Sequence, residues 1–324
     1  MASSPAGSPD RAHLPAWLAL SGAALIGVLT AVQARINGQL GLRLDDGFVA
    51  AAISFSSGLV ILIVLSLMVP VGRRGFGSLV AGVRERTIPW WMLAGGAAGA
   101  FTVATQGLVV AIIGVSLFTV GFIAGQTVSG LALDRIGFGP GGAVAVTVPR
   151  VAGGAFALAA VVLSISGAPV GATPVWMLIL PFAAGVGVAW QQATNGRLRQ
   201  RVGTPLTATL VNFIGGTVIL VIAALIHVGI VGSPQPLPNE PWLYLGGAIG
   251  VVYIFLSAAL VAHLGVLLLA LGTIVGQLFA AVVMDALWPA ASSPGLVREI
   301  AVVTVALASV LVVAIPWGRF RRSS

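Results

Sequence analysis

The sequence predicts an all-α integral membrane protein with ten transmembrane helices, arranged as two inverted repeats of five helices. Hydrophobic residues make up 58% of the 324-residue chain and charged residues only 7%. Uncharged runs of about twenty apolar residues, the length that crosses a bilayer, recur along it. In addition, the stretch Gly27 to Leu62 is repeated at Gly185 to Leu220, 158 residues later (185 minus 27). An internal repeat in so apolar a chain is typical of a membrane transporter.

The composition also excludes several classes of function. The chain has no cysteine and three scattered histidines, so we expect no disulfide, no metal site and no cofactor. All sixteen basic residues are arginine and the net charge is +8, but this excess belongs at membrane surfaces and predicts no nucleic-acid partner. The expected partners are the lipid bilayer, a small-molecule substrate and a second copy of the chain in a homodimer.

The first apolar run could be read as a secretory signal, because it follows Arg11 and ends in small residues. Its repeat around Pro181 is internal, however, so we expect the run to be retained as a span. The predicted spans are 14–34, 48–71, 89–113, 116–133, 148–168, 174–194, 205–229, 242–264, 266–284 and 298–317. Tight hairpins at Gly114 and Gly265 separate the two closest pairs. The expected organisation is a disordered tail at 1–13, a first repeat at 14–168, a second at 174–318 and a basic tail at 319–324.

Five spans per half place the second repeat upside down relative to the first. With both termini in the cytoplasm, thirteen arginines lie inside, and only Arg35, Arg43 and Arg298 lie outside. This agrees with the positive-inside rule. We therefore expect a multi-pass protein of the inner (plasma) membrane with cytoplasmic N- and C-termini.

The sharpest repeated motif is Gly-xxx-Gly-Gln, which ends at Gln126 in the fourth span and at Gln277 in the ninth. The glycines favour close helix packing. An amide in mid-membrane must face either a partner helix or a wet cavity, and both alternatives stay open for the two glutamines.

A second repeated motif places an amide pair four residues apart, and so on one helix face. Gln33 and Asn37 form the pair in the first repeat, and Gln191 and Asn195 form it in the second. Asn followed by Gly is also typical of a helix C-cap, and capping is favoured for the two asparagines. Gln33 and Gln191 are then the better candidates for a substrate site, and Asn212 is a weaker one.

Two acid–base pairs are also duplicated, namely Asp134 with Arg150 and Asp285 with Arg298. An ion pair that holds a helix hairpin at the membrane surface is the favoured interpretation. The alternative is a proton-coupling role, although no carboxylate falls in the middle of a span. Trp190, with Phe101 and Tyr253, lies further into the membrane than the other aromatic residues, and it is a candidate wall for an apolar or cationic solute.

Together these motifs resemble the YdcZ-type branch of the drug/metabolite transporter superfamily. In each half Gln-xxx-Asn-Gly is followed by a Phe-xx-Gly span, by Gly-Gln-xxxxxxx-Asp and by an arginine. The resemblance runs from about Leu14 to Arg319, and it implies a fused pair of five-span units that form an inner-membrane bundle and transport a small molecule. The membrane-embedded glutamate of small multidrug transporters is missing, so its proton-exchange role is not carried over.

The leading functional hypothesis is an alternating-access secondary transporter, an exporter of a small metabolite or drug-like molecule, with the paired glutamines in its site. The alternative is a membrane scaffold or lipid-handling partner that transports nothing. An intramembrane enzyme is the least favoured class, because neither a carboxylate dyad nor a nucleophile with a base lies at one depth. We therefore expect no catalytic residue.

Overall fold

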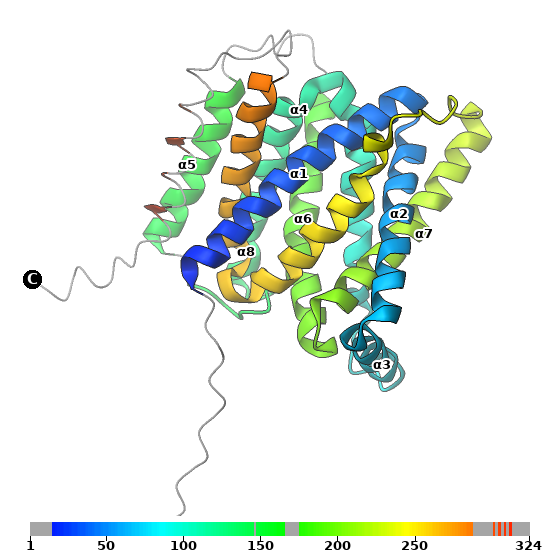
Figure 1. Cartoon of the computed structure of the whole chain (residues 1–324). Coiled ribbons are helices and arrows are strands. Elements are labelled where there is room, and N and C mark those ends of the chain that lie inside the picture. Colours follow the sequence, from blue (N-terminus) through cyan, green and yellow to red (C-terminus); the bar gives the residue numbers. More distant parts are fainter. Residues whose placement is uncertain are drawn as a thin grey trace, which may run out of the picture.

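The computed structural model describes residues 15–145, 147–165 and 175–287, together with the helical positions 301, 304, 305, 308, 311 and 312. All regular structure in these ranges is helical (Figure 1). The elements are α1 (Ala16–Leu44), α2 (Gly47–Met68), α3 (Pro70–Arg84), η1 (Trp90–Leu93), α4 (Gly95–Arg135), α5 (Val148–Ile165), α6 (Val175–Val202), α7 (Pro205–Val231), η3 (Pro241–Tyr244) and α8 (Gly246–Leu287).

Within the described ranges, five helical segments are long and apolar enough to cross a bilayer. They are Ala16–Leu44, Gly47–Met68, Trp90–Val110, Pro205–Val231 and Pro241–Ala280. Large aliphatic side chains cover the outer faces of α2 and α7, where Leu67 is 64% exposed and Leu225 is 68% exposed. Such surfaces are stable only in lipid, because water would face a continuous apolar patch.

The predicted ends of several spans were wrong. The first span was predicted to stop at residue 34, but α1 continues to Leu44 and ends where Asp45 adopts a left-handed conformation. Arg35 therefore lies inside a helix and not in a connection. The predicted span 48–71 is divided between α2 and the separate helix α3.

The two predicted hairpins have different outcomes. The break at Gly265 is present, because this residue has φ +74° inside α8 and the chain turns back there (Figure 1). By contrast, Gly95–Arg135 is a single helical element of 41 residues where two spans were predicted around Gly114. The predicted span 298–317 lies almost entirely outside the described residues.

The two repeats exchange partners. Among the described elements, the most extensive contacts join α4 to α6 and α1 to α8, so the first helix of each repeat packs on the helix of the other repeat that carries its Gly-xxx-Gly-Gln motif. The contact between α2 and α7 is the next most extensive. Because α1 corresponds to α6, α2 to α7 and α4 to α8, these contacts follow an approximate two-fold relation between the repeats.

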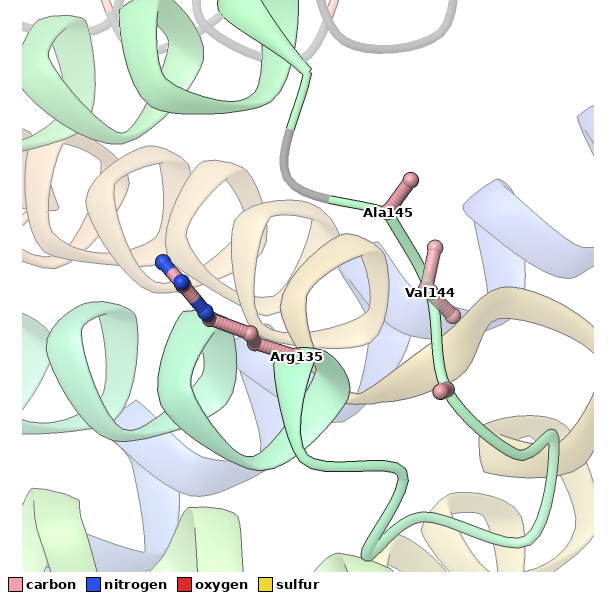
Figure 2. Close-up of a pocket in the computed structure, with 4 residues that line it drawn as sticks. Arg135, Val144 and Ala145 are labelled. Carbon is pink, nitrogen blue, oxygen red and sulfur yellow. The ribbon is translucent and has the colours of Figure 1, made fainter.

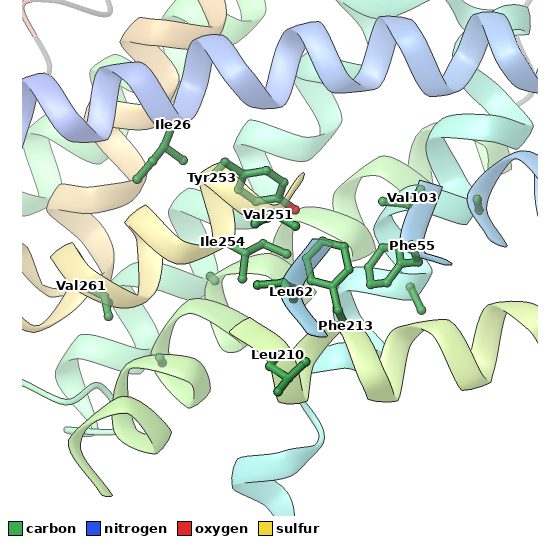
Figure 3. Packing of buried hydrophobic residues seen from close by; sticks show 14 of the residues in the cluster. Ile26, Phe55, Leu62, Val103, Leu210, Phe213, Val251, Tyr253, Ile254 and Val261 are labelled. Atoms are coloured by element: carbon green, nitrogen blue, oxygen red, sulfur yellow. The ribbon is translucent and has the colours of Figure 1, made fainter. Parts of the chain in front are cut away.

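Phe55 of α2 and Phe213 of α7 occupy corresponding positions in the two repeats, and their ring centroids lie 4.8 Å apart. Figure 3 shows the two rings side by side in the main apolar cluster. A Cβ atom added at Gly216 would meet the ring of Phe55, and one added at Gly58 would meet the ring of Phe213. The glycines thus let the two aromatic rings fill the contact between the repeats.

Candidate functional site

The Gly-xxx-Gly-Gln motifs lie where the repeats approach most closely. A Cβ atom added at Gly185 of α6 would lie 2.8 Å from the backbone nitrogen of Gln126, and closer still to the carbonyl oxygen of Phe122. In the other copy, a Cβ atom at Gly27 of α1 would lie 2.7 Å from the backbone nitrogen of Gln277. Backbones in such contact leave no room for a side chain, which agrees with close packing as the role predicted for small residues.

Gln126 and Gln277 are buried at these two contacts, with 0% and 3% of their surface exposed. Within the part of the chain that the structure describes, neither polar atom of the Gln126 side chain has a hydrogen-bond partner. The same holds there for Oε1 of Gln277. An unpaired buried amide costs about 1–3 kcal/mol, so these two positions keep a polar group where an apolar one would be more stable.

A first polar cluster joins α1, α2 and α4 to the start of α8. Gln33 donates a hydrogen bond from Nε2 to the carbonyl oxygen of Gly246 (2.8 Å), and Asn37 donates from Nδ2 to Oε1 of Gln106 (2.9 Å). A Cβ atom at Gly246 would lie 2.9 Å from the hydroxyl oxygen of Ser54. Oε1 of Gln33, Oδ1 of Asn37 and Oγ of Ser54 accept no hydrogen bond from the described residues.

A second polar cluster repeats this arrangement with the two halves exchanged. Gln191 of α6 donates from Nε2 to Oδ1 of Asn212 on α7 (3.0 Å). Cβ atoms added at Gly99 and Gly95 of α4 would lie 2.6 Å from Nε2 of Gln191 and 2.5 Å from Oδ1 of Asn195. The structure therefore brings five of the predicted amides together in two groups, namely Gln33 with Asn37, and Gln191 with Asn195 and Asn212. Each group joins the first two helices of one repeat to a glycine-lined segment of the other, and the first group also includes Gln106 of α4.

The predicted C-caps at the Asn-Gly pairs were wrong. Asn37 and Gly38 lie inside α1, and Asn195 and Gly196 lie inside α6. Both glycines serve packing, since a Cβ atom at Gly38 would lie 2.9 Å from Val110 and one at Gly196 would meet Val261. The two asparagines are consequently free to make tertiary contacts.

Asp134 forms the predicted ion pair with Arg150, with Oδ2 2.6 Å from Nη2. It also accepts hydrogen bonds from the backbone nitrogens of Val266 (2.8 Å) and Leu267 (3.0 Å). These amides begin the second part of α8, just after the break at Gly265, so the carboxylate caps a helix of the other repeat. The corresponding contacts of Asp285 and Arg298 lie outside the described residues.

The three residues of the predicted aromatic wall differ in burial. Trp190 is half-buried on α6, whereas Phe101 is 40% exposed and Tyr253 is buried in the main apolar cluster near Ile26 (Figure 3). The aromatic wall stays a prediction.

The pocket drawn in Figure 2 lies away from these amides. It has a volume of about 570 Å³, and it is lined by Arg135 at the end of α4 and by Ala143, Val144 and Ala145 in the connection to α5. None of the amides of the two clusters is among its lining residues.

Gln106 is a member of the first cluster that the sequence interpretation missed. It is fully buried, and its Nε2 has no hydrogen-bond partner among the described residues. The position that corresponds to it in the second repeat holds Ser257, so the duplication did not single it out. The detectable signal was an amide within an otherwise apolar span.

Comparisons with known proteins agree with this architecture. The sequence profile of one family, described as "Putative inner membrane exporter, YdcZ", matches residues 18–163 and 176–312. No curated protein matches the chain. A crystal structure described only as "Crystal structure of protein" aligns over 92% of this chain and 96% of its own, with a TM-score of 0.59 and 19% identity. At that identity the likeness concerns the fold alone.

The two segments that the profile matches coincide with the two repeats, and they leave out only the ends of the chain and the connection between the halves. The chain therefore belongs to the YdcZ family of inner-membrane exporters in the drug/metabolite transporter group, in its two-repeat form.

Proposed function

We propose that this protein is an alternating-access secondary transporter that exports a small, uncharged, hydrogen-bonding molecule from the cytoplasm. The observation that carries the proposal is the presence of two equivalent polar clusters, each at a contact between the two repeats. In an inverted repeat, opening one such contact while closing the other exposes a central site to alternate sides of the membrane.

The two clusters differ in their hydrogen bonds, as this mechanism requires. Gln33 donates to a backbone carbonyl of the other repeat, whereas Gln191 donates to Asn212 within its own repeat. The contact made by Gln33 thus joins the halves, and the one made by Gln191 does not. We infer that the hydrogen bond of Gln33 breaks when its end of the bundle opens.

The distribution of charged and neutral groups in the interior supports a neutral polar substrate. Among the described residues, the buried charged side chains are Asp46 and Asp134. Both cap helices, and Asp134 also forms an ion pair with Arg150. The unpaired polar groups are amides and hydroxyls, apart from one guanidinium nitrogen of Arg197. Neutral donors and acceptors favour a neutral polar solute, because a charged one would be left without a counter-charge in a low-dielectric interior.

Gln126 and Gln277 belong to neither cluster, and they test whether the repeated amides at the α4–α6 and α1–α8 contacts are part of the substrate site. Changing Gln126 and Gln277 together to Leu removes two buried amides at little steric cost. We expect the melting temperature to stay or rise, because an unpaired buried amide is replaced by an apolar group. We also expect the variant to lose efflux of neutral polar solutes from proteoliposomes. Gln39→Leu, a half-buried glutamine outside both clusters, is the control and should retain efflux.

The result distinguishes a carrier from a scaffold. A scaffold gives no solute flux with either protein under any imposed pH or voltage gradient. If the double variant remains folded and retains full flux, the two glutamines are not part of the substrate site.

A further inference from the structure

Helix α3 breaks the relation between the two repeats. The offset between corresponding residues is 158 at Gly58 and Gly216 but 151 at Gly95 and Gly246, so the first repeat is seven residues longer between these points (158 minus 151). These extra residues allow α3 to form. The corresponding connection of the second repeat, residues 232–240, contains no helix.

One face of α3 is fixed to the protein by glycines. The residues buried there are Gly72, Gly75, Leu79 and Gly82. A Cβ atom at Gly72 would lie 2.7 Å from the backbone of Ser66, and one at Gly82 would lie 2.6 Å from Ile88. These contacts fix the rotation of α3 about its own axis. The residues on the rest of its surface therefore point in defined directions.

The second face is apolar and exposed. Phe76, Val80 and Val83 share one side of the helix, at spacings of four and three residues, and they are 47%, 52% and 45% exposed. Only Val69 separates α3 from the end of α2, where Leu67 and Met68 are 64% and 72% exposed. The stripe thus lies on a helix that directly follows an apolar surface suited to lipid.

The third face is basic. Arg73 and Arg84 are eleven positions apart and lie on nearly the same side of the helix, next to the apolar stripe, and Arg74 and Arg86 are exposed nearby. Glu85 is the single acidic residue among them. An apolar stripe bordered by arginines is the arrangement that lies in the plane of a membrane interface and attracts anionic headgroups.

We propose that α3 is a binding surface for anionic phospholipid headgroups in the leaflet it adjoins, with Arg73, Arg74 and Arg84 as the headgroup ligands. Charge complementarity and the direct connection of α3 to the lipid-facing helix α2 favour lipid over a soluble protein partner. The inference rests on the membrane placement of the proposed transporter, but it requires no transport. The surface is confined to one repeat, so we expect the protein to recognise anionic lipid much more strongly at one membrane face than at the other.

The chain contains no cysteine, so a fluorophore can be attached at a single introduced site. Gly77→Cys is suitable, because a Cβ atom there meets nothing within 4 Å. Leu237→Cys, in the connection 232–240, is the matched control. The full-length protein is placed in nanodiscs with a quencher on either phosphatidylglycerol or phosphatidylcholine, at equal mole fraction.

For the label at residue 77 we expect the anionic quencher to be enriched about fivefold over the zwitterionic one, the ratio for roughly one arginine–headgroup interaction. The ratio should fall to near one when R73Q/R74Q/R84Q is added to the labelled chain, or when the labelled chain with intact arginines is placed at high salt, which screens exposed charges. If the triple variant does not fold, the measurement at high salt still tests the role of the arginine charges. At residue 237 the ratio should stay near one.

Three outcomes would overturn the proposal. The first is an anionic-to-zwitterionic ratio near one at residue 77 when the arginines are intact. The second is a raised ratio that survives both arginine replacement and high salt. The third is no quenching by either lipid. The last outcome would place this face away from the membrane, where a soluble partner could reach it. None of them bears on solute flux, so the transport proposal is tested separately.

Discussion

Gly27 and Gly185 show how single residues set the distance between the repeats. Each lies against the backbone of a helix from the other half, next to Gln277 or Gln126. Helices in lipid gain little from hydrophobic exclusion, so their association depends on close van der Waals contact, which these glycines permit.

Gly185→Ala should therefore destabilise the protein by about 1–3 kcal/mol, the usual cost of an added methylene in a tightly packed site. Gly229→Ala is the matched control, because its Cβ atom would meet nothing within 4 Å in the helix α7. That change should be neutral or stabilising by up to about 1 kcal/mol, from helix propensity. Thermal unfolding in detergent measures both. Equal effects at the two positions would contradict the packing role.

At the scale of elements, the two N-caps of corresponding helices differ. Asp46 caps α2 by accepting from the backbone nitrogens of Phe48 (2.9 Å) and Val49 (3.0 Å), and it also contacts Nδ1 of His227 on α7 (3.0 Å). Thr204 caps α7 by accepting one hydrogen bond, from the backbone nitrogen of Leu206 (3.2 Å). The α2–α7 pair is thus joined by an additional side-chain contact at one end.

We expect Asp46→Ala to cost more stability than Thr204→Ala, which should cost about 1 kcal/mol. If the contact with His227 accounts for the larger stability cost of Asp46→Ala, the two alanine variants should cost the same when they are made in a His227→Ala background. Differential scanning fluorimetry of the four proteins provides the comparison. An excess that survives the His227 change would show that the second capping bond is its source.

Asp134 links three elements, namely α4, α5 and the second part of α8. Asp134→Ala should cost about 3–5 kcal/mol, because it removes two hydrogen bonds that cap α8 and leaves the guanidinium of Arg150, whose side chain is only 13% exposed, without its ion-pair partner. Arg150→Ala in addition should cost little more, since the two effects are coupled. A double-mutant cycle by thermal unfolding tests this, with exposed Glu85→Ala as the control. Strictly additive costs would contradict the coupling.

At the scale of the whole molecule, the orientation of the bundle can be measured. Ser78 on α3 and Leu237 in the connection 232–240 are both exposed and belong to corresponding regions of inverted repeats. In the orientation we propose, Leu237→Cys should react in intact cells with a thiol reagent that does not cross the membrane. Ser78→Cys should react only after the cells are permeabilised. The opposite pattern would reverse the proposed topology.

Much of the architecture could be predicted from the sequence, because bilayer thickness sets the length of each apolar run and the duplication leaves matching motifs in the two halves. Apolar run length locates the spans, and the repeated motifs align the two halves. The break at Gly265 was also predictable, since glycine readily adopts a positive φ. The end of α1 was not, because residues 35–44 are only moderately apolar and their helix is stabilised by contacts with α4 and η3.

By itself, the sequence determined the family, the membrane environment, the duplication and the identity of the repeated amides. Only the tertiary structure decided that Asn37 and Asn195 lie inside helices, that each repeat packs its first helix on the other, and that Gln106 joins a cluster whose counterpart has no glutamine. It also decided that α3 is a separate helix with a basic face. The physical reason is that these features depend on contacts between segments far apart in the chain, whereas composition and periodicity report only on local structure and burial.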